Sequence, residues 1–339
     1  MNLNSLLTNP EYSFLRTHPR LGGRIMLLGV SGSYGYGTNR DGSDIDLRGV
    51  TLNLPSDLLG LTVFEQYEDE VTDTVIYSFN KLVSLLLNCN PNTIEILGLD
   101  EDQYLIKTAL GQKLLDNRHL FLSKRAAASF GHYADAQLRR LQNAIARDSM
   151  SQPSREEHIL RSVRHAMEDF NRKNQNLADN PVELFIDTAV TEGLETEIFL
   201  KADFDHYPLR KYNELMNGLN SVVKEYDHLG RRNHKKDDNH LNKHAMHLVR
   251  LFMMGIDILE EGEIRTHRPE SDLTLLRSIR SGEYMVDGAF ISAFYEIVSD
   301  YEKRFAEAES RSSLPENPDM EAVGRFVESI NRRAITEEF

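Results

Sequence analysis

The sequence holds a single cysteine, Cys89, in 339 residues. One thiol excludes an intrachain disulfide framework and a metal cluster built from several cysteines. No apolar run approaches the roughly 20 residues that a membrane-spanning helix requires. The N-terminal stretch MNLNSLLTNPEYSF also lacks the basic flank and long apolar core of a signal peptide. These absences predict a cytoplasmic protein without a membrane partner.

Positive charge is in the minority, because 39 lysines and arginines face 53 acidic residues and the formal net charge is −14. This balance argues against a general nucleic-acid coat, since phosphate neutralisation needs clustered lysine and arginine. A local basic stretch does exist in GRRNHKKDDNH, and it indicates either a solvated loop or a local basic groove. Its members are Arg231, Arg232, Lys235 and Lys236.

The N-terminal third has the alternating apolar pattern of a small mixed α/β unit. Three segments predict strands: RIMLLGV at 24–30, SDIDLRGVTL at 43–52 and TDTVIYSF at 72–79. A helix is predicted over 80–90 from the spacing of its leucines, and Asn92 is predicted to cap the next helix.

After Leu122 the pattern changes to long amphipathic helices, interrupted by a possible β-hairpin near 182–204. The chain length also favours two domains over one. We therefore predict an α/β (α+β) head with a mixed sheet over 1–118. A mostly α-helical domain is predicted over 119–339, with a last helix after PENPD.

A glycine-rich turn follows the first predicted strand, in the stretch GVSGSYGYGTNRDGSDIDLRGV from Gly29 to Val50. Such a turn exposes backbone N–H groups, and a helix start adds partial positive charge, so the two together form an anion site. Gly32 and Ser33 stand directly after the strand, where the missing side chain of Gly32 lets a phosphate approach. The lysine of a P-loop is absent, because the stretch does not fit G-x-x-x-x-G-K-[ST].

Two aspartates, Asp44 and Asp46, follow this turn. On a strand their carboxylates project from one face, while Ile45 and Leu47 point into the core. Paired carboxylates repel each other unless a cation neutralises them, and hard oxygen ligands favour Mg²⁺. A solvated polar turn is the alternative, whereas the spacing D-x-x-D-x-D does not fit a calcium-binding EF-hand loop. Because the phosphate-binding turn lies just upstream, the pair predicts a nucleotide site.

The strand, Gly32-Ser33 and Asp44-x-Asp46 together resemble the signature of the DNA polymerase β nucleotidyltransferase superfamily. The segments GSYGYGTNRDGSDIDLRGV, CNPNTIEILG and NKHAMHLVRLFMMG are similar to a bacterial and phage family of nucleotidyltransferases associated with RNA repair. The resemblance implies transfer of a nucleoside monophosphate from a nucleoside triphosphate to an acceptor hydroxyl, with release of pyrophosphate. An RNA end is the favoured acceptor. A protein side chain, a small molecule and an idle nucleotide-binding sensor stay open.

The resemblance also implies two Mg²⁺ ions, or Mn²⁺, ligated by Asp44, Asp46 and a third carboxylate. Asp73 is the candidate for the third ligand and for deprotonating the acceptor hydroxyl, because VTDTVIY places it at the entry to a strand. Gly32 and Ser33 would hold the β- and γ-phosphates. Nearby carboxylates are rivals for the third position: Glu65, Glu68, Asp69 and Glu70.

A second set of polar residues lies in HLNKHAMHLVRLFMMGIDILEEGE, where Lys243, His247, Arg250 and Asp257 fall on one side of a predicted helix. The run LVRLFMMGIDIL is apolar nearly all round, so the helix is predicted to be buried and Arg250 needs a partner. One solution is a salt bridge with Asp257. The other is a polar strip in which Lys243, His247 and Arg250 contact the triphosphate or the acceptor, and the family resemblance favours it.

Three further features have open roles. Arg48, two residues after Asp46, could steady the carboxylates, contact substrate or form a structural ion pair. Asn90, Asn92 and Glu95 are ambiguous, with Glu95 either supporting the site or lying exposed on a helix. A zinc site is a weak alternative, since neither a carboxylate nor a cysteine completes the set His240, His244 and His247.

Overall fold

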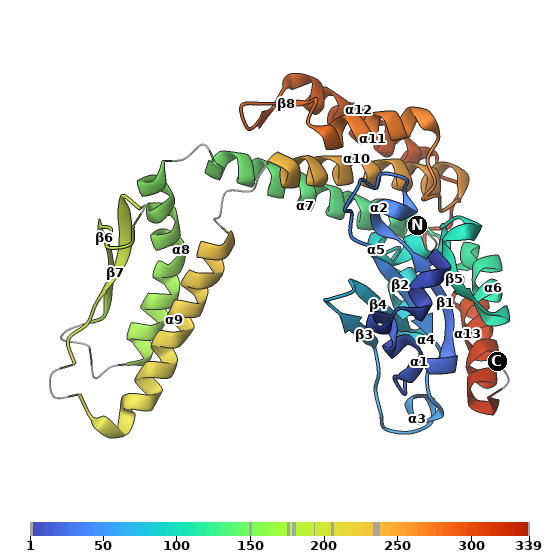
Figure 1. The fold of residues 1–339 in the computed structure, drawn as a ribbon, viewed down its shortest axis with the longest axis horizontal. Coiled ribbons are helices and arrows are strands. Elements are labelled where there is room, and N and C mark those ends of the chain that lie inside the picture. The colour runs from blue at the N-terminus through green and yellow to red at the C-terminus, as the bar shows by residue number, and fades with distance from the viewer. Residues whose placement is uncertain are drawn as a thin grey trace. The chain divides into compact units, whose positions relative to one another are not determined.

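A computed structural model describes residues 3–148, 151–174, 177, 181–192, 194–204, 207–232 and 238–337. The chain separates into two compact units, Met1–Arg139 with Asn242–Phe339, and Arg140–Leu241 (Figure 1). This division differs from the boundary predicted near residue 118. The reason is that the C-terminal helices pack with the N-terminal sheet, whereas the middle of the chain has a core of its own.

The first unit contains the predicted mixed sheet, with strand order β3-β4-β2-β1-β5. Only β2 and β4 are parallel, and the other neighbours are antiparallel. Strands β3 and β5 were not predicted, and β2 begins at Leu47, later than expected. The strands are β1 (Ile25–Val30), β2 (Leu47–Thr51), β3 (Gln66–Asp69), β4 (Thr74–Ser78) and β5 (Tyr104–Lys107).

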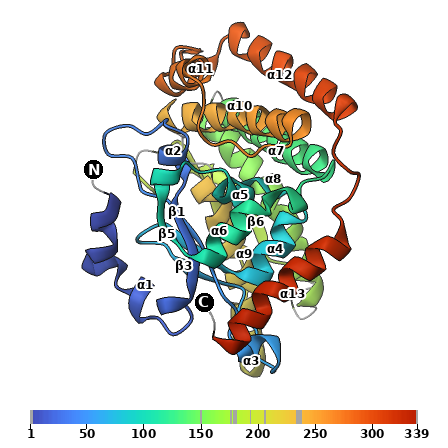
Figure 2. The same ribbon diagram turned by 90° about the vertical axis from the view of Figure 1, so that its right-hand side faces the viewer.

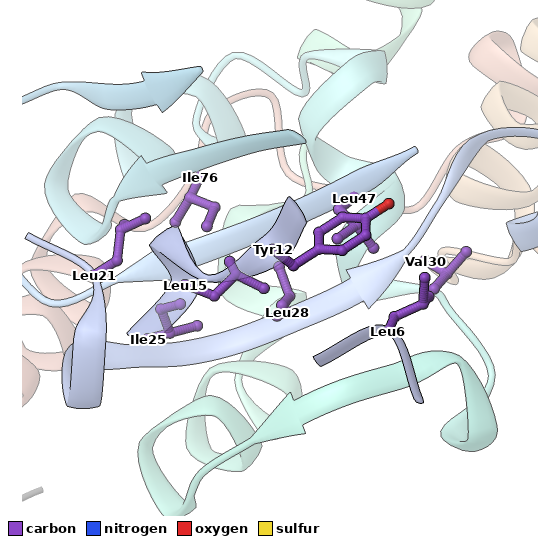
Figure 3. Packing of buried hydrophobic residues seen from close by; sticks show 9 residues of the cluster. All are labelled: Leu6, Tyr12, Leu15, Leu21, Ile25, Leu28, Val30, Leu47 and Ile76. Atoms are coloured by element: carbon purple, nitrogen blue, oxygen red, sulfur yellow. The ribbon is translucent and has the colours of Figure 1, made fainter. Parts of the chain in front are cut away.

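One face of this sheet is covered by the N-terminal segment, which includes η1 (Leu3–Thr8) and α1 (Phe14–Thr17). Figure 3 shows Tyr12 and Leu15 lying over the sheet residues Leu28 and Leu47. Ile45 packs against the same cluster, as the alternation in the sequence predicts. The buried residues of this cluster are Leu6, Tyr12, Leu15, Leu21, Ile25, Leu28, Val30, Leu47 and Ile76.

The opposite face is covered by helices from both ends of the chain: α4 (Phe79–Leu86), α6 (Ala109–Asp116) and α13 (Met320–Thr336). Figure 2 shows α13 running beside α4. Phe326 of α13 makes edge-on contacts with Phe79 and Phe121, each with ring centroids 6.1 Å apart. The last helix begins after Asp319, whose side chain caps it, as the break at PENPD predicts.

Helix α5 (Pro91–Ile94) begins two residues earlier than predicted. Its cap is Asn90, whose side-chain oxygen accepts a hydrogen bond from the backbone N–H of Asn92 at 3.0 Å. The prediction of Asn92 as the cap is therefore wrong. The reason is that Pro91 occupies the first helical position, where its fixed φ is favourable and its missing N–H is not needed.

This unit also contains longer helices, as the amphipathic pattern indicates. They are α7 (Arg125–Asp148), α10 (Asp238–Glu261), α11 (Glu270–Ser281) and α12 (Ser292–Arg311). Both α7 and α10 pass the unit boundary. Helix α10 is buried on most of its circumference between residues 248 and 259, as predicted. None of the helices within the described ranges combines the length and apolar character that a membrane crossing demands.

The second unit pairs α8 (Gln152–Lys173) with α9 (Tyr212–Arg232) and with an antiparallel hairpin of β6 (Glu183–Thr188) and β7 (Thr196–Lys201) (Figure 1). This hairpin lies where one was predicted, between 182 and 204. Its inward side chains pack on a core that includes Val163, Phe170 and Leu215. In the basic stretch, Arg231 and Arg232 end α9, and Lys235 and Lys236 lie outside the described residues.

Candidate active site

The glycine-rich turn lies against one of the predicted catalytic carboxylates. Strand β1 ends at Val30, and the short helix α2 (Gly32–Gly35) follows Ser31. Gly32 has φ +59°, in the left-handed region, and a Cβ atom at this position would overlap with Asp46 Oδ2. The Ser31 N–H also donates to the Asp46 carbonyl at 2.8 Å. The absence of a side chain at Gly32 therefore gives room to the Asp46 carboxylate.

Asp46 and Asp73 lie side by side because they precede two parallel neighbouring strands. Leu47 of β2 pairs with Thr74 of β4, and the Leu47 N–H donates to the Asp73 carbonyl at 3.1 Å. The two carboxyl groups are close enough to share a hydrogen bond. Asp73 itself has φ +44° in the turn between β3 and β4. The structure thus brings together two of the three predicted catalytic carboxylates.

Arg48 steadies this pair. Its Nη2 atom lies 3.1 Å from Asp73 Oδ1 and 3.8 Å from Asp46 Oδ1. Its Nη1 atom also donates to the Asp73 carbonyl at 2.7 Å. Among the roles left open by the sequence, the geometry favours orientation of the two carboxylates, since a single guanidinium contacts both.

The carboxylate pair has unequal affinities for protons. Burial, reinforced by the neighbouring Asp73, raises the pKa of Asp46 to about 6. Burial acts in the same direction on Asp73, but hydrogen bonds from Asp46 and Arg48 outweigh it and lower the pKa of Asp73. Lys243 of α10 is near enough to favour the charged form of both carboxyls. Two cationic side chains, Arg48 and Lys243, thus stand beside the two carboxylates. Because burial penalises the charged form of Asp46, a further cation bound beside it would be stabilising.

Asp44 does not lie with this pair of carboxylates. It is exposed in the loop before β2, whose pairing with its neighbours begins only at Leu47. The expectation that Asp44 and Asp46 share a strand is therefore wrong, because residues 43–46 form a loop. Across the described ranges, no three histidine, cysteine, aspartate or glutamate side chains are arranged to hold a metal ion. The role of Asp44 as a metal ligand stays a prediction.

The rival carboxylates have other partners or lie at the surface. Glu65 pairs with Lys81 Nζ at 2.9 Å, and Glu68 accepts a hydrogen bond from Gln66. The Asp69 carboxylate accepts the Val71 and Thr72 N–H groups, at 3.0 and 2.9 Å, and so shapes the turn that carries Asp73. Glu70 is exposed in that turn. The geometry thus favours Asp73 over the other four.

Arg250 of α10 points toward the glycine-rich turn rather than toward Asp257. Its guanidinium carbon lies 3.9 Å from the ring centroid of Tyr36, and Nη2 lies 2.9 Å from His247 Nδ1. Asp257 instead pairs with the buried Arg268, at 2.6 Å. The salt-bridge alternative is therefore wrong. Within the described ranges Arg250 has no carboxylate partner, so its charge is available to an anionic ligand.

Glu95, which the sequence left ambiguous, is buried at the centre of this region with 8% of its surface exposed. Its Oε1 atom accepts a hydrogen bond from the Ser31 hydroxyl at 2.8 Å. A small cavity beside it is lined by Tyr36, Asn92, His247 and Arg250, among others. The only sign of Glu95 in the sequence was its place in the segment CNPNTIEILG. Its contact with Ser31 joins residues that are 64 positions apart, and a local pattern cannot show such a contact.

A comparison with protein families agrees with this arrangement. The model of the family RlaP, described as the RNA repair pathway DNA polymerase beta family, matches residues 11–168. No match was found among curated proteins or among solved structures. The matched segment contains the whole five-stranded sheet, the carboxylate pair and Glu95. The predicted resemblance to polymerase β-like nucleotidyltransferases associated with RNA repair is therefore confirmed over residues 11–168.

Proposed function

We propose that the protein is a Mg²⁺-dependent nucleotidyltransferase that moves a nucleoside monophosphate from a nucleoside triphosphate to a hydroxyl at an RNA end, with release of pyrophosphate. The observation that carries this proposal is the Asp46–Asp73 pair, packed directly against the Gly32 turn. A turn of backbone N–H groups beside a pair of hard oxygen ligands supports a site for both a phosphate and a cation.

The residues present fit a divalent cation. Asp46 and Asp73 offer hard oxygen ligands, and a cation bound there would stabilise the ionised form of Asp46, whose pKa burial raises to about 6. Mg²⁺ or Mn²⁺ bound there would stabilise the attacking and leaving oxygens of an in-line displacement. Asp44, two residues before Asp46, is the third ligand that we propose.

The triphosphate would be held from two sides. Backbone N–H groups at Gly32 and Ser33 bind the β- and γ-phosphates. Lys243, His247 and Arg250 of α10 neutralise the same charge from the opposite side. The stacking of Arg250 on Tyr36 fixes the plane of its guanidinium, and a fixed plane favours bidentate binding of phosphate oxygens.

Asp73 is suited to receive the proton of the acceptor hydroxyl. Its side chain is 51% exposed, against 24% for Asp46, so an incoming acceptor reaches it more easily. Its lowered pKa keeps it ionised, and Arg48 holds it in position. A carboxylate that is ionised and oriented can accept a proton as the new ester bond forms.

The acceptor is the part of the proposal that rests on the family description rather than on geometry. The net charge of −14 gives some support to a protein side chain as the acceptor, because it disfavours a long RNA contact. Separate acceptor classes in one experiment can distinguish the two.

The test incubates the purified protein with Mg²⁺ and each nucleoside triphosphate labelled at the α-phosphate. Total cellular RNA, a protein extract or neither is added. Label on RNA, absent with Asp44→Ala/Asp46→Ala and retained with the exposed loop variant Asp41→Asn, would support the proposal. Label on protein would show that the acceptor is a protein side chain instead of RNA. Nucleotide binding without transfer to any class would leave a sensor and contradict the proposal.

Arg250→Gln is expected to raise the KM for the nucleoside triphosphate by about 10- to 100-fold. The reason is that one or more charge-assisted hydrogen bonds to phosphate would be lost. The variant keeps most of the side-chain volume, so we expect the melting temperature to change little. Steady-state kinetics with varied triphosphate would measure the effect. Arg325→Gln, an exposed position on α13, is the matched control, and an equal KM in both variants would refute the role of Arg250.

The pKa of Asp46 makes a prediction about stability without divalent cations. Because the folded state raises this pKa, the contribution of Asp46 is present below the ordinary pKa near 3.8 and is lost as pH rises through about 6. Asp46→Asn should therefore gain stability relative to the wild type between pH 4.5 and 6.5, and then level off. The lowered pKa of Asp73 acts at lower pH, outside this window.

Denaturant unfolding in EDTA at several pH values would measure this difference. Asp41→Asn, in the exposed part of the same loop, should show no such trend. A difference between Asp46→Asn and the wild type that is constant with pH would contradict the raised pKa of Asp46.

A further inference from the structure

We propose that Glu95 is a positioning residue that fixes the phosphate-binding turn, by holding Ser31 at its start and Tyr36 at its end. This role rests on the proposed function, since it concerns the turn that would bind the triphosphate. Glu95 itself would touch neither substrate nor cation.

The first contact joins Glu95 to the backbone of Asp46 through one residue. Glu95 Oε1 accepts the hydrogen bond of the Ser31 hydroxyl at 2.8 Å. The backbone N–H of the same serine donates to the Asp46 carbonyl at 2.8 Å. Ser31 is 1% exposed, so water does not compete for either bond. A shift of Glu95 would therefore displace Ser31 and the neighbouring Asp46 together.

The second contact joins Glu95 to the cationic side of the site. The Tyr36 hydroxyl lies near the Glu95 carboxylate, while Arg250 stacks on the face of the same ring. The hydroxyl donates to Met254 Sδ at 3.6 Å, an acceptor weaker than a carboxylate. Burial, followed by the charge of Glu95, raises the pKa of Tyr36, so the phenol stays a donor at neutral pH. Glu95 thus orients the ring on which Arg250 rests.

The chemistry of these partners explains why a carboxylate stands here. The Ser31 hydroxyl donates to Glu95 and the Tyr36 hydroxyl lies near it, and a carboxylate offers two acceptor oxygens without a donor of its own. A glutamine offers only one acceptor oxygen and would turn an N–H group toward the other hydroxyl. A buried carboxylate is costly unless it is hydrogen-bonded, and the Ser31 hydroxyl supplies such a bond. The arrangement is therefore specific for glutamate.

Two measurements test this role, one of which does not depend on activity. Amide hydrogen exchange of the unliganded protein is followed at residues 31–37, with β1 as an internal reference. Titration with MgATP, and with the other three Mg-nucleoside triphosphates, then gives the change in affinity. The variants are Glu95→Gln, Glu95→Ala, Ser31→Ala and the double variant Ser31→Ala/Glu95→Ala. Glu101→Gln, an exposed glutamate nearby, is the control.

We expect Glu95→Ala to accelerate exchange in the turn but not in β1, and to weaken binding of the preferred triphosphate by about 10-fold or more. Glu95→Gln should fall between Glu95→Ala and the wild type, because it keeps one acceptor. The double variant should bind no more weakly than Glu95→Ala, since both substitutions remove the same bond. In a transfer assay, KM should rise more than kcat falls.

Unchanged exchange in the turn, or strictly additive effects of Ser31→Ala and Glu95→Ala, would overturn the positioning role. Failure of the proposed function looks different. In that case the wild type itself transfers no nucleotide, while the exchange measurement still reports whether Glu95 holds the turn.

Discussion

Asp46→Asn is expected to lower nucleotidyl transfer by more than about 100-fold, because loss of a supporting residue around a metal ion already costs 10- to 100-fold. Asparagine has nearly the same volume and leaves the backbone bond from Ser31 to residue 46 in place. The fold should therefore persist. The negative charge that would bind the cation and balance Arg48 is lost, so the defect should lie in catalysis and cation binding.

Rates of transfer to the acceptor identified above, at saturating triphosphate and varied Mg²⁺, would measure this loss. Asp73→Asn should produce a comparable loss, because the two carboxylates form one pair. Asp41→Asn, in the same loop but exposed, should retain wild-type activity. If Asp46→Asn transferred nucleotide at the wild-type rate, neither a catalytic nor a metal-binding role could be kept for this pair.

The parts of the site that follow from local sequence were predictable. Ile45 and Leu47 are apolar and alternate with Asp44 and Asp46, so their side chains could be predicted to point into the core. Both pack on the core in the structure. Asp73 was singled out because it stands directly before a strand. Its neighbour across the sheet is Asp46, since the strands that follow the two aspartates run parallel.

Other parts depend on contacts that no local pattern encodes. Glu95 reaches Ser31 across 64 residues, and the partner of Asp257 is Arg268 on a loop after the helix. The spacing of Arg250 and Asp257 on one helical face made them apparent partners, but Tyr36 of the head supplies the actual contact for Arg250. Tertiary packing therefore decided between alternatives that helical geometry left equal.

The boundaries of the strands and domains could not be predicted from the sequence either. Strand β5 (Tyr104–Lys107) is half-buried at every position, so it lacks the alternation by which strands are recognised. Asp44 was assigned to a strand because its neighbours alternate, yet backbone pairing begins only at Leu47. The unit Arg140–Leu241 is inserted between two segments that pack together. A change in helical content along the chain cannot show that the C-terminal segment packs with the N-terminal one.

Gly32→Ala is expected to abolish most of the transfer activity while reducing stability only modestly. Two effects act at this position. The left-handed φ of +59° disfavours any residue with a Cβ atom, at a cost of about 1–2 kcal/mol in the free energy of unfolding. The added methyl group would also overlap with Asp46 Oδ2, so the carboxylate must move away from its place beside the turn.

Gly42→Ala separates these two effects. Gly42 has φ +80° and lies in the same loop region, but a Cβ atom there would meet nothing within 4 Å. Both variants should lose similar stability in denaturant unfolding, whereas only Gly32→Ala should lose activity, by more than about 100-fold if displacement of Asp46 matches its removal. Equal activity of the two variants would mean that Asp46 can move freely without consequence. In that case the close packing of Gly32 on Asp46 would not set the geometry of the reaction.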